Sequence, residues 1–315
     1  EFVRVLAGGV VHVDVGDPDV VVGAFSVVTR VTTAADRGRW TGYMRGGQTL
    51  GFPAGLVVGG LTADFLGFRA AFTVAFAAAA VAFLVSVLVL PDLTPPDDAG
   101  ESAGLRDVPR LAFADTRVFA VGATNFAVRF IYAGILLSTV VEYAAANHVH
   151  VGVLSATGVS GVVMAVSAVF SAAATVVVGP LSDRAPDRSW VILPALALLA
   201  VGFALLAFVP TLPGTLVGVA AIGLGVEGAN LPLLAYLGDI SPADDVGKLG
   251  GVYNVFGDFG STVGPLVALP IAAATSYTSE YLGCALCVVL VAALVALAVG
   301  GDDATVGSTA VPADD

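Results

Sequence analysis

Charged residues are scarce in this sequence, and positive charge is scarcest. Only 12% of the 315 residues are Asp, Glu, Lys or Arg, against about 25% in an ordinary soluble domain. The net charge is −12, and Lys248 is the one lysine. A chain this acidic repels nucleic acid and other acidic molecules. We therefore expect neither nucleic acid nor an acidic substrate as a partner.

Motifs for catalysis, cofactors and metals are also missing. The sequence has no G-x-x-x-x-G-K-[ST] phosphate loop and no nucleophile–base constellation. Cys284 and Cys287 stand one helical turn apart but lack a second ligand pair, so we interpret them as helix-packing residues. His12, His148 and His150 lie in or near loops without metal-ligand spacing. The sequence therefore predicts no enzyme, no cofactor and no bound metal.

Long apolar runs are what the sequence has instead. Hydrophobic residues make up 57% of the chain and the mean hydropathy is +0.93. A helix needs about 20 apolar residues to cross a bilayer. The chain is therefore predicted to be an all-α polytopic membrane protein surrounded by lipid. Eight runs are long enough, namely Tyr43–Thr62, Ala71–Leu90, Val118–Val141, Val151–Val178, Trp190–Val209, Thr215–Leu237, Val252–Ala274 and Leu282–Val299.

The first 40 residues are less regular. Asp14, Asp17 and Asp19, together with Pro18, interrupt apolar sequence on both sides. Carboxylates do not lie unpaired in hydrocarbon. This region is expected to hold one broken span, two half-spans or a corrupted stretch. The start at Glu1, without Met, favours a fragment of a longer protein.

Positive charge alternates between successive linkers. Cytoplasmic loops carry an excess of Lys and Arg. Only Arg69 departs from the alternation. The linker Pro91–Arg117 and the tail from Gly300 are therefore predicted to be cytoplasmic, as are both ends of the last six spans. The basic residues of the alternate linkers are Arg30, Arg37 and Arg39, then Arg106, Arg110 and Arg117, then Arg184 and Arg188, and finally Lys248.

A glycine-rich segment that begins at Asp36 recurs 209 residues later. Both copies start on the same predicted side, as expected for two parallel halves related by an axis along the membrane normal. Glycines four apart allow two helix backbones to approach closely. The matched pairs are Asp36 with Asp245, Gly38 with Gly247, Arg39 with Lys248, Gly42 with Gly251, Gly51 with Gly260 and Gly55 with Gly264.

These segments resemble the fifth-helix motif of the major facilitator superfamily, G-x8-G-x3-G-P-x2-G-G. Leu56 replaces the motif's proline in the first copy, and Ala268 and Leu269 replace its last glycines in the second. The family associates the motif with exporters that exchange substrate for ions. The resemblance implies a role in helix packing for Gly42, Gly51, Gly55, Gly59 and Gly60 and, in the second copy, for Gly251, Gly260, Gly264 and Pro265.

Two shorter segments resemble other motifs of the same family. The loop "GPLSDRAPDR" resembles its cytoplasmic signature, although Pro186 stands where the family has glycine. "RVLAG" resembles the fourth-helix motif through Arg4 and Gly8, with Ala7 for its glutamine, and the family implicates this arginine in coupling. The resemblance implies a cytoplasmic gate formed by Gly179, Asp183, Arg184 and Arg188.

The family's fold has two bundles and twelve helices. The resemblance therefore implies that this chain holds helices 4–12, with helices 1–3 missing. We expect a partial first bundle over residues 1–90, a cytoplasmic linker over 91–117, a six-helix bundle over 118–299 and an acidic cytoplasmic tail over 300–315.

Three ionisable residues fall near the middle of the predicted spans. Counted from the cytoplasmic ends, Arg129, Glu227 and Asp258 lie about 16, 18 and 14 Å deep, close to the bilayer midplane at about 15 Å. Each has an asparagine on its own helix face, respectively Asn125, Asn230 and Asn254. Ionisable residues at this depth indicate function, and we expect all three to be buried between the two bundles. Arg45, one turn inside its span, is expected to snorkel instead.

One arginine cannot compensate two carboxylates in a medium of low dielectric. We expect Arg129 to pair with Asp258, while Glu227 takes up a proton; a static ion-pair cluster is the alternative. The sequence thus predicts a monomeric secondary active transporter of the cell membrane. The predicted transporter moves a small solute by alternating access and is coupled to protons. The sequence slightly favours export over import. A non-transporting receptor or scaffold with the same fold, and an intramembrane enzyme, are the other classes considered.

Overall fold

The computed structural model describes residues 37–89, 113, 115–241 and 246–299. Within these ranges the regular structure is entirely helical, which confirms the predicted all-α fold class. Arg4 and the first 36 residues lie outside the described residues, as do the linker over 90–112 and the tail from residue 300. The helices are α3 (Arg37–Leu66), α4 (Phe68–Val89), α6 (Thr116–Arg129), η2 (Phe130–Leu136), α7 (Leu137–Ala146), α8 (Ala156–Arg184), α9 (Ser189–Phe208), α10 (Leu212–Ile240), α11 (Val246–Ala274) and α12 (Tyr277–Val299).

Each of the eight predicted apolar runs corresponds to one continuous helical segment. Seven of these segments in the described part of the chain are long and apolar enough to cross a membrane, and α3 contributes a shorter apolar stretch, Gly51–Leu66. Their bounds differ from the apolar runs. The run from Val151 begins with a turn, so that α8 starts only at Ala156, whereas α12 starts five residues before the predicted Leu282.

The span that starts with α6 is not uniformly α-helical. Directly after Arg129 the chain makes a π-helical turn, η2, before α7 completes the span. The sequence predicted an uninterrupted helix over Val118–Val141. A π-helical turn of this kind is rare and is often found at functional sites.

Polar residues fix the starts of two helices. Asp115 is the N-cap of α6, and its carboxylate accepts a hydrogen bond from the backbone N–H of Arg117 at 2.8 Å. Thr211 caps α10 in the same way and accepts from the Gly214 N–H at 3.3 Å. Both caps satisfy backbone N–H groups that the first helical turn leaves unpaired.

Replacing Asp115 by Ala is expected to destabilise the protein by about 1 kcal/mol, the usual cost of a lost N-cap. Hydrogen bonds from Arg117 hold the pKa of Asp115 below its ordinary value of 3.8. The carboxylate's contribution is therefore present above pH 3.8 and is lost as the pH falls below it. Thermal unfolding of the detergent-solubilised protein checks this, with Asp115→Asn, which keeps the cap, as the control. Equal losses in the two variants would contradict the capping role.

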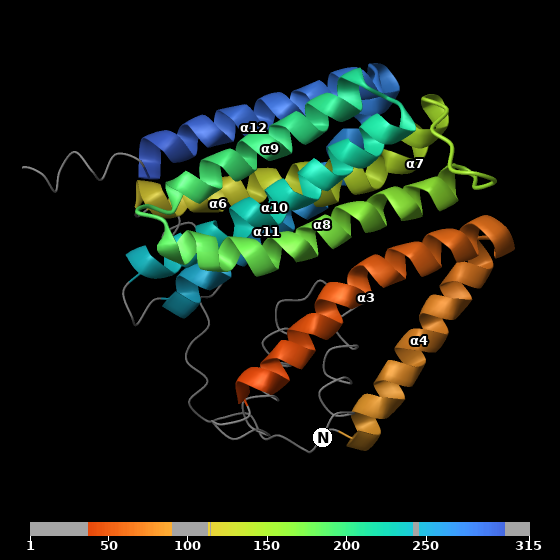
Figure 1. The fold of residues 1–315 in the computed structure, drawn as a ribbon, viewed down its shortest axis with the longest axis horizontal. Helices are drawn as coiled ribbons and strands as arrows, with labels where there is room; N and C mark the ends of the chain where they lie inside the picture. Colours follow the sequence, from red (N-terminus) through yellow and green to blue (C-terminus); the bar gives the residue numbers. More distant parts are fainter. Residues whose placement is uncertain (1–36, 90–112, 114, 242–245, 300–315) are drawn as a thin grey trace, which may run out of the picture.

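Six membrane segments form one bundle, and α3 and α4 form a separate pair (Figure 1). In the bundle, α10 packs between α8 and α9, α12 lies against α9 and α6, and α11 lies against α6 and η2. The pair contacts the bundle through α3 and α8. Figure 1 shows these two helices converging towards the turn that joins α3 to α4.

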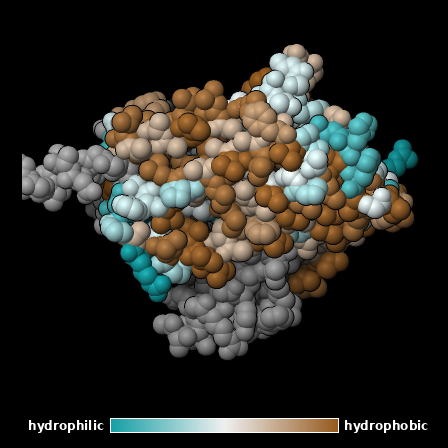
Figure 2. Space-filling model, turned by 45° about the horizontal axis from the view of Figure 1, so that its top comes forward, coloured by the Kyte–Doolittle hydropathy of each residue, from teal (hydrophilic) through white to brown (hydrophobic). Residues whose placement is uncertain are grey.

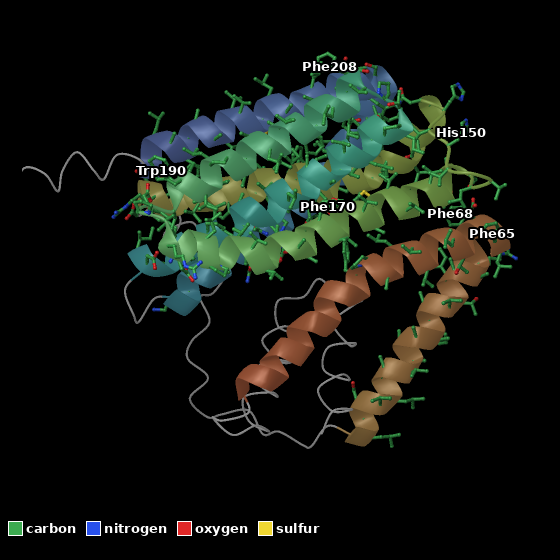
Figure 3. All side chains as sticks on the ribbon, viewed as in Figure 1. Phe65, Phe68, His150, Phe170, Trp190 and Phe208 are labelled. Carbon is green, nitrogen blue, oxygen red and sulfur yellow. The ribbon has the colours of Figure 1, made fainter. Side chains whose placement is uncertain are left out.

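The bundle has two distinct ends. The arginine end carries Arg117 at the start of α6, Arg184 at the end of α8, Arg188 before α9, and Lys248 at the start of α11. The turn end holds the short connections that follow α3, α7, α9 and α11. Figure 3 labels Trp190 at the arginine end, and Phe65, Phe68 and His150 at the turn end.

The core of the bundle lies between α9 and its neighbours. Leu196, Leu199 and Phe203 of α9 are fully buried, together with Ile222 of α10. Small residues bring the two helices together: a Cβ at Gly202 would lie 2.7 Å from the backbone oxygen of Gly218. This contact between small residues is typical of membrane bundles.

The outer surface is apolar, as a surrounding of lipid requires. Phe72 and Phe76 on α4 are 74% and 75% exposed. Figure 2 shows hydrophobic residues over most of the described surface on this side of the molecule, with hydrophilic residues mainly towards its edges. In water such a surface would aggregate, whereas in a bilayer it needs no further partner.

Candidate functional site

The predicted mid-span residues of α6 and α11 lie at a close contact between these two helices. Asn125 is only 2% exposed, and its Nδ2 donates a hydrogen bond to the backbone oxygen of Tyr253 at 2.7 Å. A Cβ at Gly257 would lie 2.7 Å from that Nδ2 and 3.3 Å from Cγ of Arg129. Gly257 therefore allows α11 to contact Asn125 and the stem of Arg129 together.

Tyr253 connects this contact to α10. Its hydroxyl donates a hydrogen bond to Oδ1 of Asn230 at 2.6 Å. Asn125 and Asn230, which the sequence singled out on separate helices, are thus linked through one tyrosine. Sequence reasoning missed Tyr253. The signal was a tyrosine beside Asn254 within an apolar span, because a buried tyrosine hydroxyl needs a polar partner.

Arg129 and Glu227 both lie near the same pair of tyrosines. Both lie within electrostatic range of Tyr132 and Tyr253. The hydroxyl of Tyr132 also accepts a hydrogen bond from the Ser167 hydroxyl at 3.4 Å. Residues of α6, η2, α8, α10 and α11 therefore meet in one polar cluster within the membrane span, which we call the tyrosine cluster: Arg129, Tyr132, Ser167, Glu227, Asn230 and Tyr253.

Asp258 and Asn254 lie on an exposed face of α11. Arg129 is exposed as well, and Glu227 is partly exposed. The expectation that all three mid-span charges are buried is therefore wrong for Arg129 and Asp258 in the described part of the chain. The reason is that both side chains extend beyond the packed core of the bundle, whereas Asn125, one turn before Arg129, points into it.

The residues of the predicted gate lie at the arginine end. Arg188 donates hydrogen bonds to Asp239 at 2.5 Å, to Ser182 at 2.9 Å and to Asp183 at 3.4 Å. The Asp239 carboxylate raises the pKa of Arg188 above its ordinary value. Arg188 thus joins the end of α8 to the end of α10. Arg184 is exposed, and Gly179 has no described atom within 4 Å of a Cβ position.

The predicted packing glycines divide into two groups. A Cβ at Gly264 would lie 2.3 Å from Cα of Gly134 in η2, and one at Gly260 would lie 2.4 Å from the Phe126 oxygen. Gly60 makes a similar contact with Gly161. No described atom lies within 4 Å of a Cβ position at Gly55, Gly59 or Gly251, so a packing role for these three stays a prediction. Gly42 and Gly51 lie in α3, and Pro265, beside Gly264 in α11, is partly buried.

A buried acid outside the tyrosine cluster also escaped the sequence reasoning. Glu280, in the first turn of α12, is 4% exposed, and neither carboxylate oxygen has a hydrogen-bond partner among the described residues. The neighbouring Tyr281 shares a hydrogen bond with Thr139 at 3.1 Å. The only signal was a single acidic residue at the start of an apolar run.

Glu280→Met is expected to stabilise the protein by about 1–3 kcal/mol, because it removes a buried polar group that lacks partners and keeps its volume. Thermal unfolding in detergent measures the change. Glu142→Met, at an exposed acid on α7, is the matched control and is expected to have a smaller effect. A lower melting temperature for Glu280→Met would show that the carboxyl group has a stabilising partner.

Long apolar helices that pack through small residues around a polar cluster define a polytopic membrane protein. The sequence profile of the Major Facilitator Superfamily matches residues 20–171 and again residues 118–312. The chain therefore belongs to the major facilitator superfamily, a family of membrane transporters of small molecules. This confirms the family predicted from the sequence and its class, a transporter rather than an enzyme.

Two solved structures are similar in fold. Both are crystal structures of a bacterial homolog of the human lysosomal transporter Spinster, one inward-facing and occupied, the other inward-facing and unoccupied. The first has a TM-score of 0.58 and 15% identity over 87% of this chain and 72% of that chain. The second has a TM-score of 0.53 and 17% identity over 88% and 72%. No curated protein matches this sequence.

Proposed function

We propose that this protein is a secondary active transporter that moves a small solute by alternating access, coupled to protons. The observation that carries this proposal is the tyrosine cluster, in which hydrogen bonds of Tyr253 join Asn125 of α6 to Asn230 of α10. Arg129 and Glu227 lie near the same tyrosine. Opposite charges held at mid-span indicate a pathway for a solute or a proton. A scaffold without transport would have no use for them.

Glu227 is the proposed proton carrier, and Asp258 the partner of Arg129. Glu227 is partly exposed and borders Tyr132 and Tyr253, whose hydroxyls can pass or receive a proton. When Glu227 is protonated and neutral, Asp258 alone compensates the positive charge of Arg129. When it is ionised, the two acids compete for one arginine. Proton binding thereby changes the charge that a solute meets.

A proton-flux assay tests the coupling. The complete protein is reconstituted in vesicles and screened against lipophilic cations, sugars and organic acids. With Glu227→Gln, the dependence of solute flux on the proton gradient is expected to disappear. Glu142→Gln, an acid of the same bundle outside the tyrosine cluster, is the control and should keep it. Unchanged gradient dependence in Glu227→Gln would rule out this role.

The proposed orientation places the arginine end in the cytoplasm, because basic residues favour that side. The tail of the six-helix bundle and the linker before it are then cytoplasmic as well, and the membrane is the cell membrane. Arg188, which joins α8 to α10 through Asp183 and Asp239, is the centre of the proposed cytoplasmic gate. Export of the solute by a monomer is the form of transport that we propose.

A further inference from the structure

A carboxylate of α3 caps a helix of the other bundle. Asp64, in the last turns of α3, accepts hydrogen bonds from the backbone N–H of Ser155 at 3.1 and 3.2 Å. The hydroxyl of Ser155 also donates to Oδ1 of Asp64. Ser155 is the N-cap residue of α8, yet its side chain makes no capping hydrogen bond to its own helix. The start of α8 therefore relies on a carboxylate from another part of the chain.

Glycines bring the two backbones together beside this contact. A Cβ at Gly158 would lie 2.8 Å from Oδ2 of Asp64, so a larger residue there would displace the carboxylate. About one helical turn away from this contact, before Asp64 in α3 and after Gly158 in α8, a Cβ at Gly60 would lie 2.9 Å from Cα of Gly161. The seam of Gly60, Gly158 and Gly161 holds Asp64 at the positive end of the α8 dipole.

This contact lies at the turn end, opposite the proposed cytoplasmic gate (Figure 1). We propose that Asp64 is a latch that closes the turn end of the transporter by capping α8 from the first bundle. The inference rests on alternating access, the proposed function. Opening of this end separates α3 from α8, so the Ser155 N–H and the Asp64 carboxylate must both exchange their partner for water. The latch therefore favours the state that is closed at the turn end.

The rate at which a cysteine beyond the latch is labelled measures how strongly the latch holds the turn end closed. In the full protein, Cys284 and Cys287 are replaced by Ala, and Thr262→Cys is added on the exposed α11 face that carries Asp258. A membrane-impermeant maleimide is applied from the side of the turn end. Asp64→Ala is expected to raise the labelling rate about tenfold, since hydrogen bonds to a charged group are lost. Ser155→Ala, which keeps the backbone N–H, should raise it less.

Controls separate the latch from general loosening of the protein. Asp64→Asn keeps the size of the side chain and one acceptor oxygen, and is expected to fall between wild type and Asp64→Ala. Glu142→Gln should label at the wild-type rate. If Asp64→Ala and Asp64→Asn both label at the wild-type rate while thermal unfolding shows them folded, Asp64 is not a latch.

A disulfide can hold the same contact shut. The Cβ position at Gly158 lies 3.2 Å from Cβ of Asp64, close to the spacing of about 3.8 Å in disulfides. The double variant Asp64→Cys/Gly158→Cys is combined with Thr262→Cys, whose thiol is reversibly protected while the disulfide is formed by oxidation. With the disulfide in place, labelling of Thr262→Cys is expected to stop. Reduction of the disulfide should restore the labelling. Labelling that continues when the disulfide has formed overturns the latch. Neither readout needs a solute or a proton gradient, so a failure of Glu227→Gln to alter coupling would leave this result intact.

Discussion

Alanine at Gly264 is expected to destabilise the protein strongly. Its Cβ would lie 2.3 Å from Cα of Gly134 and 2.8 Å from the backbone oxygen of Phe130. Neither atom is the end of a flexible side chain, so α11 and η2 must move apart. Overpacking of this kind costs about 1–3 kcal/mol, and more where backbone is displaced. Thermal unfolding and monodispersity in detergent measure the loss.

The same helix provides a matched control. Gly251→Ala places the same methyl group on α11, where no described atom lies within 4 Å. It is expected to be neutral or slightly stabilising, because alanine is the better helix former. Gly134→Ala, on the other side of the contact, should behave like Gly264→Ala, since its Cβ would lie 2.5 Å from Cα of Gly264. Equal stability of Gly264→Ala and Gly251→Ala would mean that the helices adjust without cost.

Arg129→Ala is expected to reduce transport about 10- to 100-fold, the effect of losing a charged hydrogen-bonding group of about 1.5–3 kcal/mol. Arg129 is exposed, so its loss should change the free energy of unfolding by no more than about 0.5 kcal/mol. Solute flux in vesicles and thermal unfolding are measured on the same preparation. A large functional loss with little loss of stability identifies a residue of the transport pathway.

Two further variants sharpen this result. Arg129→Lys keeps the charge but not the planar fork of donors, and is expected to retain part of the activity. Asn125→Ala, one turn earlier, removes a buried hydrogen bond to Tyr253 and should lower stability as well as transport. If Arg129→Ala lowers stability as much as Asn125→Ala does, Arg129 belongs to a static ion-pair cluster instead.

The order of the spans was readable from the sequence because hydrocarbon forces each crossing segment to be long and apolar. Helix ends were less readable. Val151 continues an apolar run but belongs to the turn before α8, since the cap from Asp64 fixes the start of that helix. Glu280 falls outside its apolar run but inside α12. Hydropathy measures transfer to lipid and does not report capping.

The candidate site was readable in part. Mid-span charges such as Arg129 and Glu227 stand out because they are costly in lipid. Tyr253 does not stand out in this way, because tyrosine is common in apolar helices. Its role follows from hydrogen bonds to two helices, one of them to a residue 128 positions away. The exposure of Arg129 and Asp258 likewise depends on which helix faces are covered, and one sequence does not reveal that.

By itself, then, the sequence determined that the chain crosses a membrane repeatedly, in which order, and with which polar residues at mid-depth. These properties follow from the free energy of transferring each segment from water into lipid, which depends on that segment's own residues. Tertiary structure alone decided which residues meet, such as Asp64 with Ser155, Gly264 with Gly134 and Asn125 with Tyr253. Lipid is as apolar as the helices, so hydropathy does not choose between partners. Close backbone contact and shared hydrogen bonds make that choice, and both exist only once the helices are packed.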